Sequence, residues 1–182
     1  MQNAKNPLPR VGISRCLLGE SVRYDGGHKL DPTLIGELAS VFEWVPVCPE
    51  VEVGMGVPRE PIELVVSASC AGVRLLGVQS AEDWTKRMRE FAARRVGELR
   101  ALGLAGFVLK ARSPSCGVRD VPVRGSASTG RGLFADVLVT LVPALPVEDE
   151  ERLRDRDLRA KFITDVIAYR RQRNGWADDH PS

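Results

Sequence analysis

Three of the four cysteines lie in short segments that carry other reactive side chains. The segments are Ser14-Arg15-Cys16-Leu17, Cys48-Pro49-Glu50 and Ser113-Pro114-Ser115-Cys116-Gly117. Each follows a short apolar run that is typical of a strand, at 11–13, 44–47 and 106–109. Because the ends of parallel strands lie along one edge of a sheet, we expect the three thiols to converge there. Three thiolate ligands leave one position on a metal or cluster open to substrate, so the pattern predicts a reactive centre.

The segment around Cys116 is the most specific of the three. Ser113 and Ser115 supply hydroxyls, the proline between them stiffens the turn, and Gly117 allows the backbone to approach a bulky inorganic group. Glu50 follows Cys48 by two residues and brings a proton carrier to the same strand end. Taken alone, Cys16 would be interpreted as a small buried apolar side chain, and a lone Cys-Pro-Glu could arise by chance.

The remaining cysteine and the two histidines are weaker candidates. Cys70 lies at a predicted hairpin turn with no proton carrier beside it, so we interpret it as structural or incidental. His28 ends a glycine-rich loop near the expected pocket, and His180 lies in a polar terminal tail. The sequence contains no Cys-x-x-Cys, which argues against a zinc finger or ribbon.

Length and composition predict one globular domain of ordinary hydrophobic content in 182 residues. No apolar run reaches the ~20 residues that span a bilayer, and the first residues lack an apolar signal core. We therefore expect a cytoplasmic protein without a membrane partner, in which the thiols stay reduced and do not form disulfides.

The net charge of +2 does not by itself indicate a nucleic-acid-binding protein. Its distribution is uneven, because residues 110–131 carry five cations against the single acid Asp120. The cations are Lys110, Arg112, Arg119, Arg124 and Arg131. Two interpretations remain open: a basic rim that attracts an anionic or nucleotide-like substrate, or a solvated charged surface.

Hydrophobic periodicity predicts an α/β fold: a single Rossmann-like domain with a mainly parallel sheet flanked by helices, plus a C-terminal helix. A helix over 31–41 begins with the cap Asp31 and a first-turn proline. A hairpin is expected from 62–66 and 72–77, and a long helix from about 81 to 102 with Ser80 as its cap. We predict a first domain over residues 10–148, with residues 149–182 forming an amphipathic helix and tail.

Several motifs occur in an order that resembles the thiouracil desulfidase family, long catalogued as a domain of unknown function and also found as the N-terminal domain of tRNA 2-thiouridine desulfidases. The motifs are Ser-x-Cys-Leu-x-Gly at 14–19, Val-Arg-Tyr-Asp-Gly-Gly at 22–27, Val-Cys-Pro-Glu at 47–50, Pro-Arg-x-Pro-x-Glu at 58–63, Leu-Lys-x-Arg-Ser-Pro-Ser-Cys-Gly at 109–117 and Gly-x-Gly at 130–132. The resemblance covers roughly residues 10 to 148.

The resemblance implies a 4Fe-4S cluster held by Cys16, Cys48 and Cys116, with catalytic roles for Glu50 and Ser113. We expect five further residues to contact substrate: Ser14, Tyr24, Asp25, Arg112 and Ser115. The implied reaction converts the thiocarbonyl of a thiolated uracil, nucleoside or nucleotide to the oxo form and releases sulfide.

Two alternatives stay open. One is a tRNA thiouridine desulfidase, because residues 158–171 are similar to the start of the second domain of such enzymes. The other is a non-catalytic cluster-binding module for redox sensing or sulfur transfer, which would need the cysteines but not Glu50.

Overall fold

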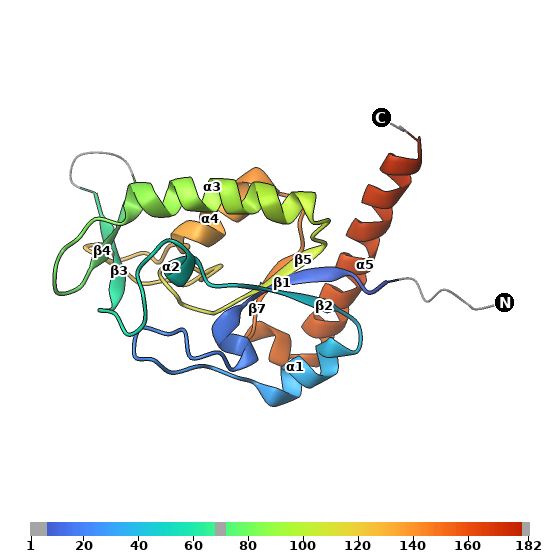
Figure 1. The fold of residues 1–182 in the computed structure, drawn as a ribbon, viewed down its shortest axis with the longest axis horizontal. Helices are drawn as coiled ribbons and strands as arrows, with labels where there is room; N and C mark the ends of the chain where they lie inside the picture. Colours follow the sequence, from blue (N-terminus) through green and yellow to red (C-terminus); the bar gives the residue numbers. More distant parts are fainter. Residues whose placement is uncertain (1–6, 68–71, 180–182) are drawn as a thin grey trace.

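Over the residues that the computed structural model describes, 7–67 and 72–179, the strands form a central sheet of four and a small sheet of three (Figure 1). The central sheet has the order β2-β1-β5-β7 and all of its pairings are parallel. Its strands are β1 (Arg10–Ser14), β2 (Glu43–Val47), β5 (Gly106–Leu109) and β7 (Val147–Asp149). This arrangement confirms the predicted α/β class and the mainly parallel sheet.

The strand order places a topological switch between β1 and β5. From β1 the chain crosses to β2 on one side, and it later returns to β5 on the other side. Ser14 pairs with Val47 and Ile13 pairs with Val108, so the strands end nearly level. Open parallel sheets bind ligands at the carboxyl edge beside such a switch, which is where the cysteine segments leave the sheet.

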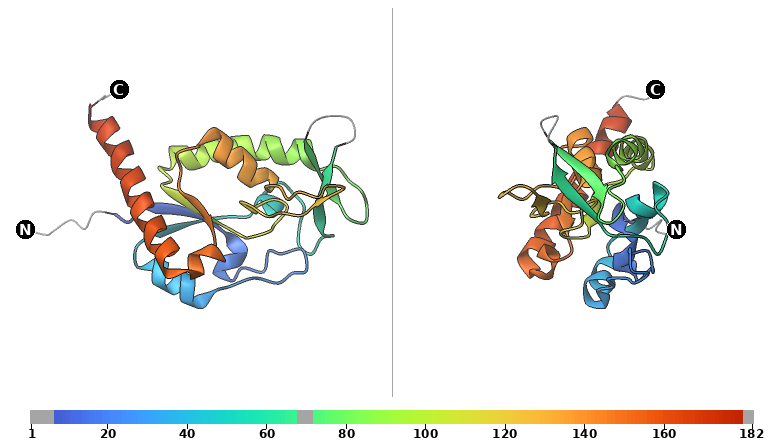
Figure 2. Two further views of the ribbon diagram at one scale, coloured as in Figure 1. Left: turned by 180° about the vertical axis from the view of Figure 1, so that it is seen from behind. Right: turned by 90° about the vertical axis from the view of Figure 1, so that its left-hand side faces the viewer.

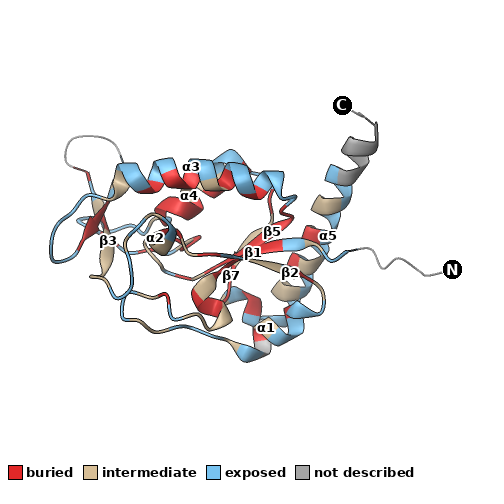
Figure 3. Cartoon of the chain, in the orientation of Figure 1, coloured by how far each residue is buried: buried red, intermediate tan, exposed pale blue. Residues whose placement is uncertain are grey.

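Helices cover both faces of the central sheet (Figures 1 and 2). One face carries α3 (Thr85–Ala101) and α4 (Leu133–Leu141), and the other carries α1 (Pro32–Ala39) and the first part of α5 (Arg156–Asp179). β5 is buried along its whole length because it packs on both sides: Phe107 and Leu109 face α3 and α4, and Val108 faces α1 and α5. Figure 3 shows the buried stripes on the inner sides of these helices.

Local signals explain the start of α1. The side chain of Asp31 accepts a hydrogen bond from the Leu34 amide at 3.2 Å, and Pro32 occupies the first turn. Leu34 and Leu38, one helical turn apart, are buried against the sheet. The predicted cap and apolar face are thus confirmed, and the helix ends at Ala39, two residues before the predicted end.

The small sheet has the order β4-β3-β6, with β3 (Ile62–Val66) antiparallel to β4 (Val73–Gly77) and parallel to β6 (Val123–Arg124). The predicted hairpin is therefore correct. Three short helices complete the described secondary structure: η1 (Arg15–Leu18), α2 (Pro49–Glu52) and η2 (Arg152–Arg154). No helix within the described residues is long and apolar enough to cross a membrane.

The prediction that Ser80 caps the long helix is wrong, because α3 begins at Thr85. The hydroxyl of Ser80 instead hydrogen-bonds the carboxylate of Glu60. The residues before the helix continue the hairpin: the Gly77 amide donates to the Glu82 carbonyl and the Trp84 amide donates to the Leu75 carbonyl. Backbone groups held in these bonds are unavailable for a helical turn.

The C-terminal segment shares the core of the preceding residues. The boundary predicted between residues 148 and 149 falls within β7, which pairs with β5. Phe162 and Val166 of α5 are buried against β1 and α1, while the later part of α5 projects beyond the sheet (Figures 1 and 2). The first half of α5 therefore helps to close one face of the central sheet.

Candidate functional site

The three cysteines of the sequence prediction line one pocket of about 330 Å³ at the carboxyl edge of the central sheet. Cys16 lies in η1 directly after β1, Cys48 lies between β2 and α2, and Cys116 lies in the loop after β5. Cys16 and Cys116 are buried and Cys48 is partly exposed. The three cysteines therefore meet at the carboxyl edge of the central sheet, as the sequence predicted.

The loop that carries Cys116 is held by its own side chains and by α4. The Ser113 hydroxyl accepts hydrogen bonds from the Ser115 and Cys116 amides at 3.3 and 3.1 Å. The first amides of α4 donate into the same loop, from Leu133 to the Pro114 carbonyl at 3.1 Å and from Phe134 to the Ser115 carbonyl at 2.9 Å. Helix N-terminal amides that have no partner within the helix thus fix the loop.

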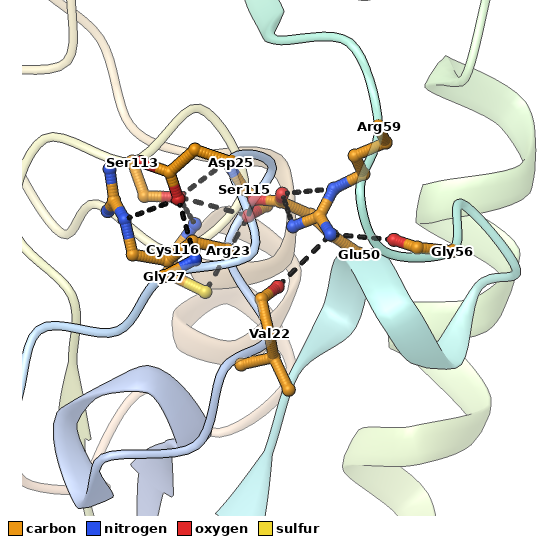
Figure 4. Close-up of polar contacts among 10 residues, drawn as sticks. All are labelled: Val22, Arg23, Asp25, Gly27, Glu50, Gly56, Arg59, Ser113, Ser115 and Cys116. Atoms are coloured by element: carbon orange, nitrogen blue, oxygen red, sulfur yellow. Dashed lines mark hydrogen bonds and ion pairs between the residues drawn. The ribbon is translucent and has the colours of Figure 1, made fainter.

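Glu50 is clamped on both carboxylate oxygens (Figure 4). Nε and Nη2 of Arg59 both donate to Oε2, with Nε at 3.0 Å, and the Ser115 hydroxyl donates to Oε1. The side chains of Glu50 and Arg59 are only 15% and 6% exposed, so the pair is weakly screened by solvent. Glu50 also lines the cysteine pocket, which brings the predicted carboxylate and thiols together.

The two serines of the Cys116 segment make different contacts, and their predicted roles stay predictions. Ser115, which is fully buried, makes the contact with Glu50. Ser113 lines the pocket and lies 3.0 Å from Ser115, oxygen to oxygen, so it reaches Glu50 through Ser115. The reason is geometric: the first serine of the turn folds back to cap the amides that follow it.

Burial raises the pKa of all three thiols. It raises the pKa of Cys16 to about 11, with the negative charge of Cys48 as the next cause. The pKa of Cys116 is raised by burial and then by Glu50 and Cys48, and that of Cys48 is raised by burial. A charge on Cys48 raises the pKa of the other two thiols because the three share one pocket. Thiols in this state release protons when they become metal ligands.

The donor set that borders the pocket consists of three thiols carried by three separate segments of the chain. Within residues 7–67 and 72–179, no three His, Cys, Asp or Glu side chains lie close enough to hold one metal ion. The cysteines border the pocket from three segments that follow β1, β2 and β5. A donor set of three sulfurs around a cavity suits an iron–sulfur cluster, whose ligands bind separate irons. Cys70 and His180 lie outside the described residues.

The residues predicted to bind substrate are only partly brought together. Ser14, Tyr24 and Arg112 line the pocket. Ser115 is buried behind it, and Asp25 lies outside the pocket lining formed by the described residues. Asp25 accepts the Gly27 amide at 3.0 Å, a hydrogen bond that lowers its carboxyl pKa and shapes the loop, and its contact with substrate stays a prediction.

Ser14 links two of the strands that carry the site. Its hydroxyl accepts the Lys110 amide at 3.0 Å, and its proximity to Cys116 partly offsets the rise of that thiol's pKa. Because Ser14 is buried, we assign it to positioning of the Cys116 loop rather than to an open binding surface.

The basic rim expected from residues 110–131 is neutralised by ion pairs. The pairs are Lys110–Glu150, Arg112–Glu151, Arg119–Glu148, Arg119–Asp149, Arg124–Glu63 and Arg131–Asp136. Four of these acids, Glu148, Asp149, Glu150 and Glu151, are consecutive in the sequence and lie at the end of β7. β7 pairs with β5, and this pairing brings the acids beside the cations. Between the two interpretations of the charge pattern, these pairs favour a solvated charged surface for the exposed Arg112, Arg124 and Arg131. Lys110 is different, because it lines the pocket and its partner Glu150 is buried.

Two residues of the pocket, Arg59 and Lys110, were not predicted as site residues from the sequence. Arg59 holds Glu50, and Lys110 lines the pocket while its ammonium group contacts the buried Glu150. Both lie in motifs that carry the family resemblance, Pro-Arg-x-Pro-x-Glu and Leu-Lys-x-Arg-Ser-Pro-Ser-Cys-Gly. Their position in those motifs was the only sequence signal of a role in the site. Their partners, Glu50 and Glu150, lie in other segments of the chain.

Comparison with known proteins agrees with this geometry. The sequence model of a family described as 2-thiouracil desulfurase matches residues 11–150. The chain belongs to this family. It is 31% identical over 132 residues to the uncharacterized protein YbbK of Bacillus subtilis (strain 168), a match that covers 69% of this chain and 87% of YbbK.

A solved structure extends the likeness to the fold. The chain is similar to the 4Fe-4S-dependent thiouracil desulfidase TudS, with a TM-score of 0.64 and 28% identity over 84% of this chain and 98% of TudS. The family and this structural relative are desulfidases, which supports an enzyme that acts on thiouracil-type compounds. The resemblance drawn from the sequence motifs is thus confirmed.

Proposed function

We propose that this protein is an iron–sulfur-dependent desulfidase that hydrolyses the thiocarbonyl of a thiolated uracil, nucleoside or nucleotide. Its products are the oxo compound and hydrogen sulfide. The observation that carries the proposal is the meeting of three thiols and one clamped carboxylate, Glu50, in a single pocket. A cluster-binding redox or sulfur-carrier module would need the thiols alone, and nothing in that role would require a carboxylate fixed at both oxygens.

In this proposal Cys16, Cys48 and Cys116 hold a 4Fe-4S cluster, as its structural relative TudS depends on one. When bound by three protein ligands, such a cluster supplies an iron with an open position that acts as a Lewis acid toward a soft thiocarbonyl sulfur. The protein supplies the ligands, the enclosure and the proton carriers.

Glu50 acts as the general base on the attacking water. Arg59 occupies Oε2 with two donors, whereas Oε1 accepts the Ser115 hydroxyl and keeps a lone pair for a further hydrogen bond. We therefore assign the proton from water to Oε1. The Ser113 and Ser115 hydroxyls, 3.0 Å apart, offer a path along which a proton moves from Oε1 to the departing sulfide.

The atoms of the reaction balance without an external oxidant or reductant. Water adds its oxygen to the thiocarbonyl carbon, the carbon–sulfur bond breaks, and the two protons of water leave with the sulfur as hydrogen sulfide. The proton held by Glu50 returns in the last step, so the residue begins the next cycle as a carboxylate.

The charges around the pocket support a small substrate over tRNA. Several cations that could face a phosphate backbone are paired with acids, including Arg159 with Glu37 and Lys161 with Asp165 on α5. Binding to nucleic acid depends on cations that replace counterions at phosphates, and paired cations do so poorly. We propose that residues 10–148 carry the chemistry and that the C-terminal segment serves mainly to close the sheet.

The Glu50→Gln variant tests the proposal. After anaerobic purification, it should retain the iron and sulfide of the wild-type protein and lose turnover of 2-thiouracil and 4-thiouridine, because the amide cannot accept the proton from water. The matched control is Glu43→Gln, which removes the same charge from a glutamate that pairs with Arg10 at the other end of β2. A fully active Glu50→Gln variant, or a wild-type protein with a full cluster and no activity, would refute the proposal.

A further inference from the structure

We propose that Arg59 is a positioning residue for the reaction: it sets the direction of the Glu50 carboxylate and ties it to the loop that walls the pocket. The inference rests on the proposed function, in which Glu50 is the general base. It adds a residue that lies outside the cysteine, glutamate and serine set on which that function depends.

The contacts of Arg59 fix it in one orientation. Nη1 donates to the Val22 carbonyl at 3.0 Å and to the Gly56 carbonyl at 2.8 Å, while Nε and Nη2 both donate to Oε2 of Glu50 (Figure 4). The guanidinium is planar and presents its donors as a rigid fork, so these bonds together determine its plane. With the side chain 6% exposed, little freedom remains.

That geometry determines which oxygen of Glu50 faces the chemistry. Two donors on Oε2 hold that oxygen toward Arg59, and Oε1 is consequently directed to Ser115 beside the cysteine loop. A carboxylate held at only one oxygen would be free to rotate about its terminal bond, because that torsion has broad minima. Arg59 also lines the pocket, and in this proposal it acts through Glu50 rather than by a contact with the substrate.

The same residue anchors a pocket wall through its backbone. The Arg59 amide donates to the Tyr24 carbonyl at 2.9 Å, and Tyr24 lines the pocket. This backbone bond survives any change of the Arg59 side chain. A substitution by lysine should consequently disturb Glu50 more than the Tyr24 wall, so that kcat changes more than KM.

The experiment compares Arg59→Lys with the wild-type protein. Lysine keeps the charge but cannot place two donors on Oε2 while bonding two carbonyls. Displacement of a reacting group by about 1 Å costs on the order of 100-fold in rate, so we expect kcat to fall by about 10- to 100-fold with KM changed by less than about 3-fold. Iron and sulfide content should be unchanged.

The matched control is Arg74→Lys. Arg74 also places Nε and Nη2 on one carboxylate oxygen, that of Asp83, at 3.1 and 2.9 Å, but it lies on β4 away from the pocket. The same chemical change there should leave kcat and KM unchanged. Guanidinium ion added to Arg59→Ala should restore part of the lost kcat, whereas sodium at equal ionic strength should not, because only guanidinium reproduces the fork.

A double-mutant cycle supplies a readout independent of turnover. Arg59→Lys and Glu50→Gln each weaken the same Arg59–Glu50 ion pair. The loss of unfolding free energy in the double variant should therefore be smaller than the sum of the two single losses. Additive losses would overturn the inference, and so would an Arg59→Lys variant with wild-type kcat. Failure of the proposed function is separate, since it would be seen as an inactive wild-type protein with a full cluster.

Discussion

Gly132 offers a sharp test of how the fold holds the Cys116 loop. It is the residue that precedes α4, and its backbone is extended, with φ −62° and ψ 145°, a conformation open to any residue. A Cβ added there would lie 2.5 Å from the Ser115 carbonyl carbon and 2.8 Å from the Cys116 amide nitrogen. Because alanine adopts these angles freely, the Gly132→Ala change tests the steric contact, together with the smaller cost of alanine at the N-cap of a helix.

The expected cost follows from that contact. Non-bonded carbons prefer about 3.5–4.0 Å, so the Ser115–Cys116 peptide or the start of α4 has to move by about 1 Å. The two sides are tied by the Gly132 amide on the Gly117 carbonyl at 2.8 Å, which leaves little room to separate. Overpacking of this kind costs about 1–3 kcal/mol in unfolding free energy.

The same movement reaches the chemistry. Ser115 holds Oε1 of Glu50, and Cys116 is a proposed cluster ligand in the pocket. A displacement of about 1 Å at either group should lower kcat on the order of 100-fold. Denaturant unfolding of the iron-free protein, iron and sulfide analysis and turnover of 2-thiouracil measure the three consequences separately.

The control is Gly97→Ala in α3. Nothing lies within 4 Å of the added Cβ, and the site is an exposed helix interior. The same substitution should stabilise the protein there by about 1 kcal/mol through helix propensity, with no effect on turnover. A Gly132→Ala variant as stable and as active as the wild type would show that the contact with the Ser115–Cys116 peptide does not hold the loop.

Three further predictions concern the cysteines and the substrate. Cys116→Ser should lose iron and brown colour while Cys70→Ser keeps both, as measured by iron analysis and the visible spectrum; iron loss from Cys70→Ser would contradict the ligand set. In the iron-free protein the pKa of Cys16 is raised from 9.0 to about 11, so the unfolded chain releases this proton first as pH rises. Stability should therefore fall through that window, by about 3 kcal/mol at ~1.36 kcal/mol per unit, and denaturant unfolding should show a flatter profile for Cys16→Ser. Turnover of 2-thiouracil should be nearly independent of salt, and fast, salt-sensitive turnover of thiolated tRNA with little activity on small compounds would refute the small-substrate proposal.

The secondary structure that supports the site was predictable because its signals are local. Asp31 and Pro32 mark the start of α1, and the apolar run at Gly106–Leu109 coincides with β5. Three such runs, each followed by a cysteine segment, were enough to place three thiols on one sheet edge, since parallel strands end on the same side. The start of α3 was not predictable from Ser80, because the hairpin holds residues 81–84 by bonds to β4.

The polar partners of the site were decided by the tertiary structure. Ser115 meets Glu50 across 65 positions of sequence and Lys110 meets Glu150 across 40, and no local pattern encodes either pair. Such pairs depend on which strand ends lie side by side and on the reach of each side chain once the backbone is placed. The sequence by itself therefore determined most of the elements around the site, the three cysteines and the carboxylate, whose spacing is set along the chain. The clamp on Glu50 and the neutralised rim exist only after β5, β7 and the segment around Arg59 have been brought together by burial of the apolar core.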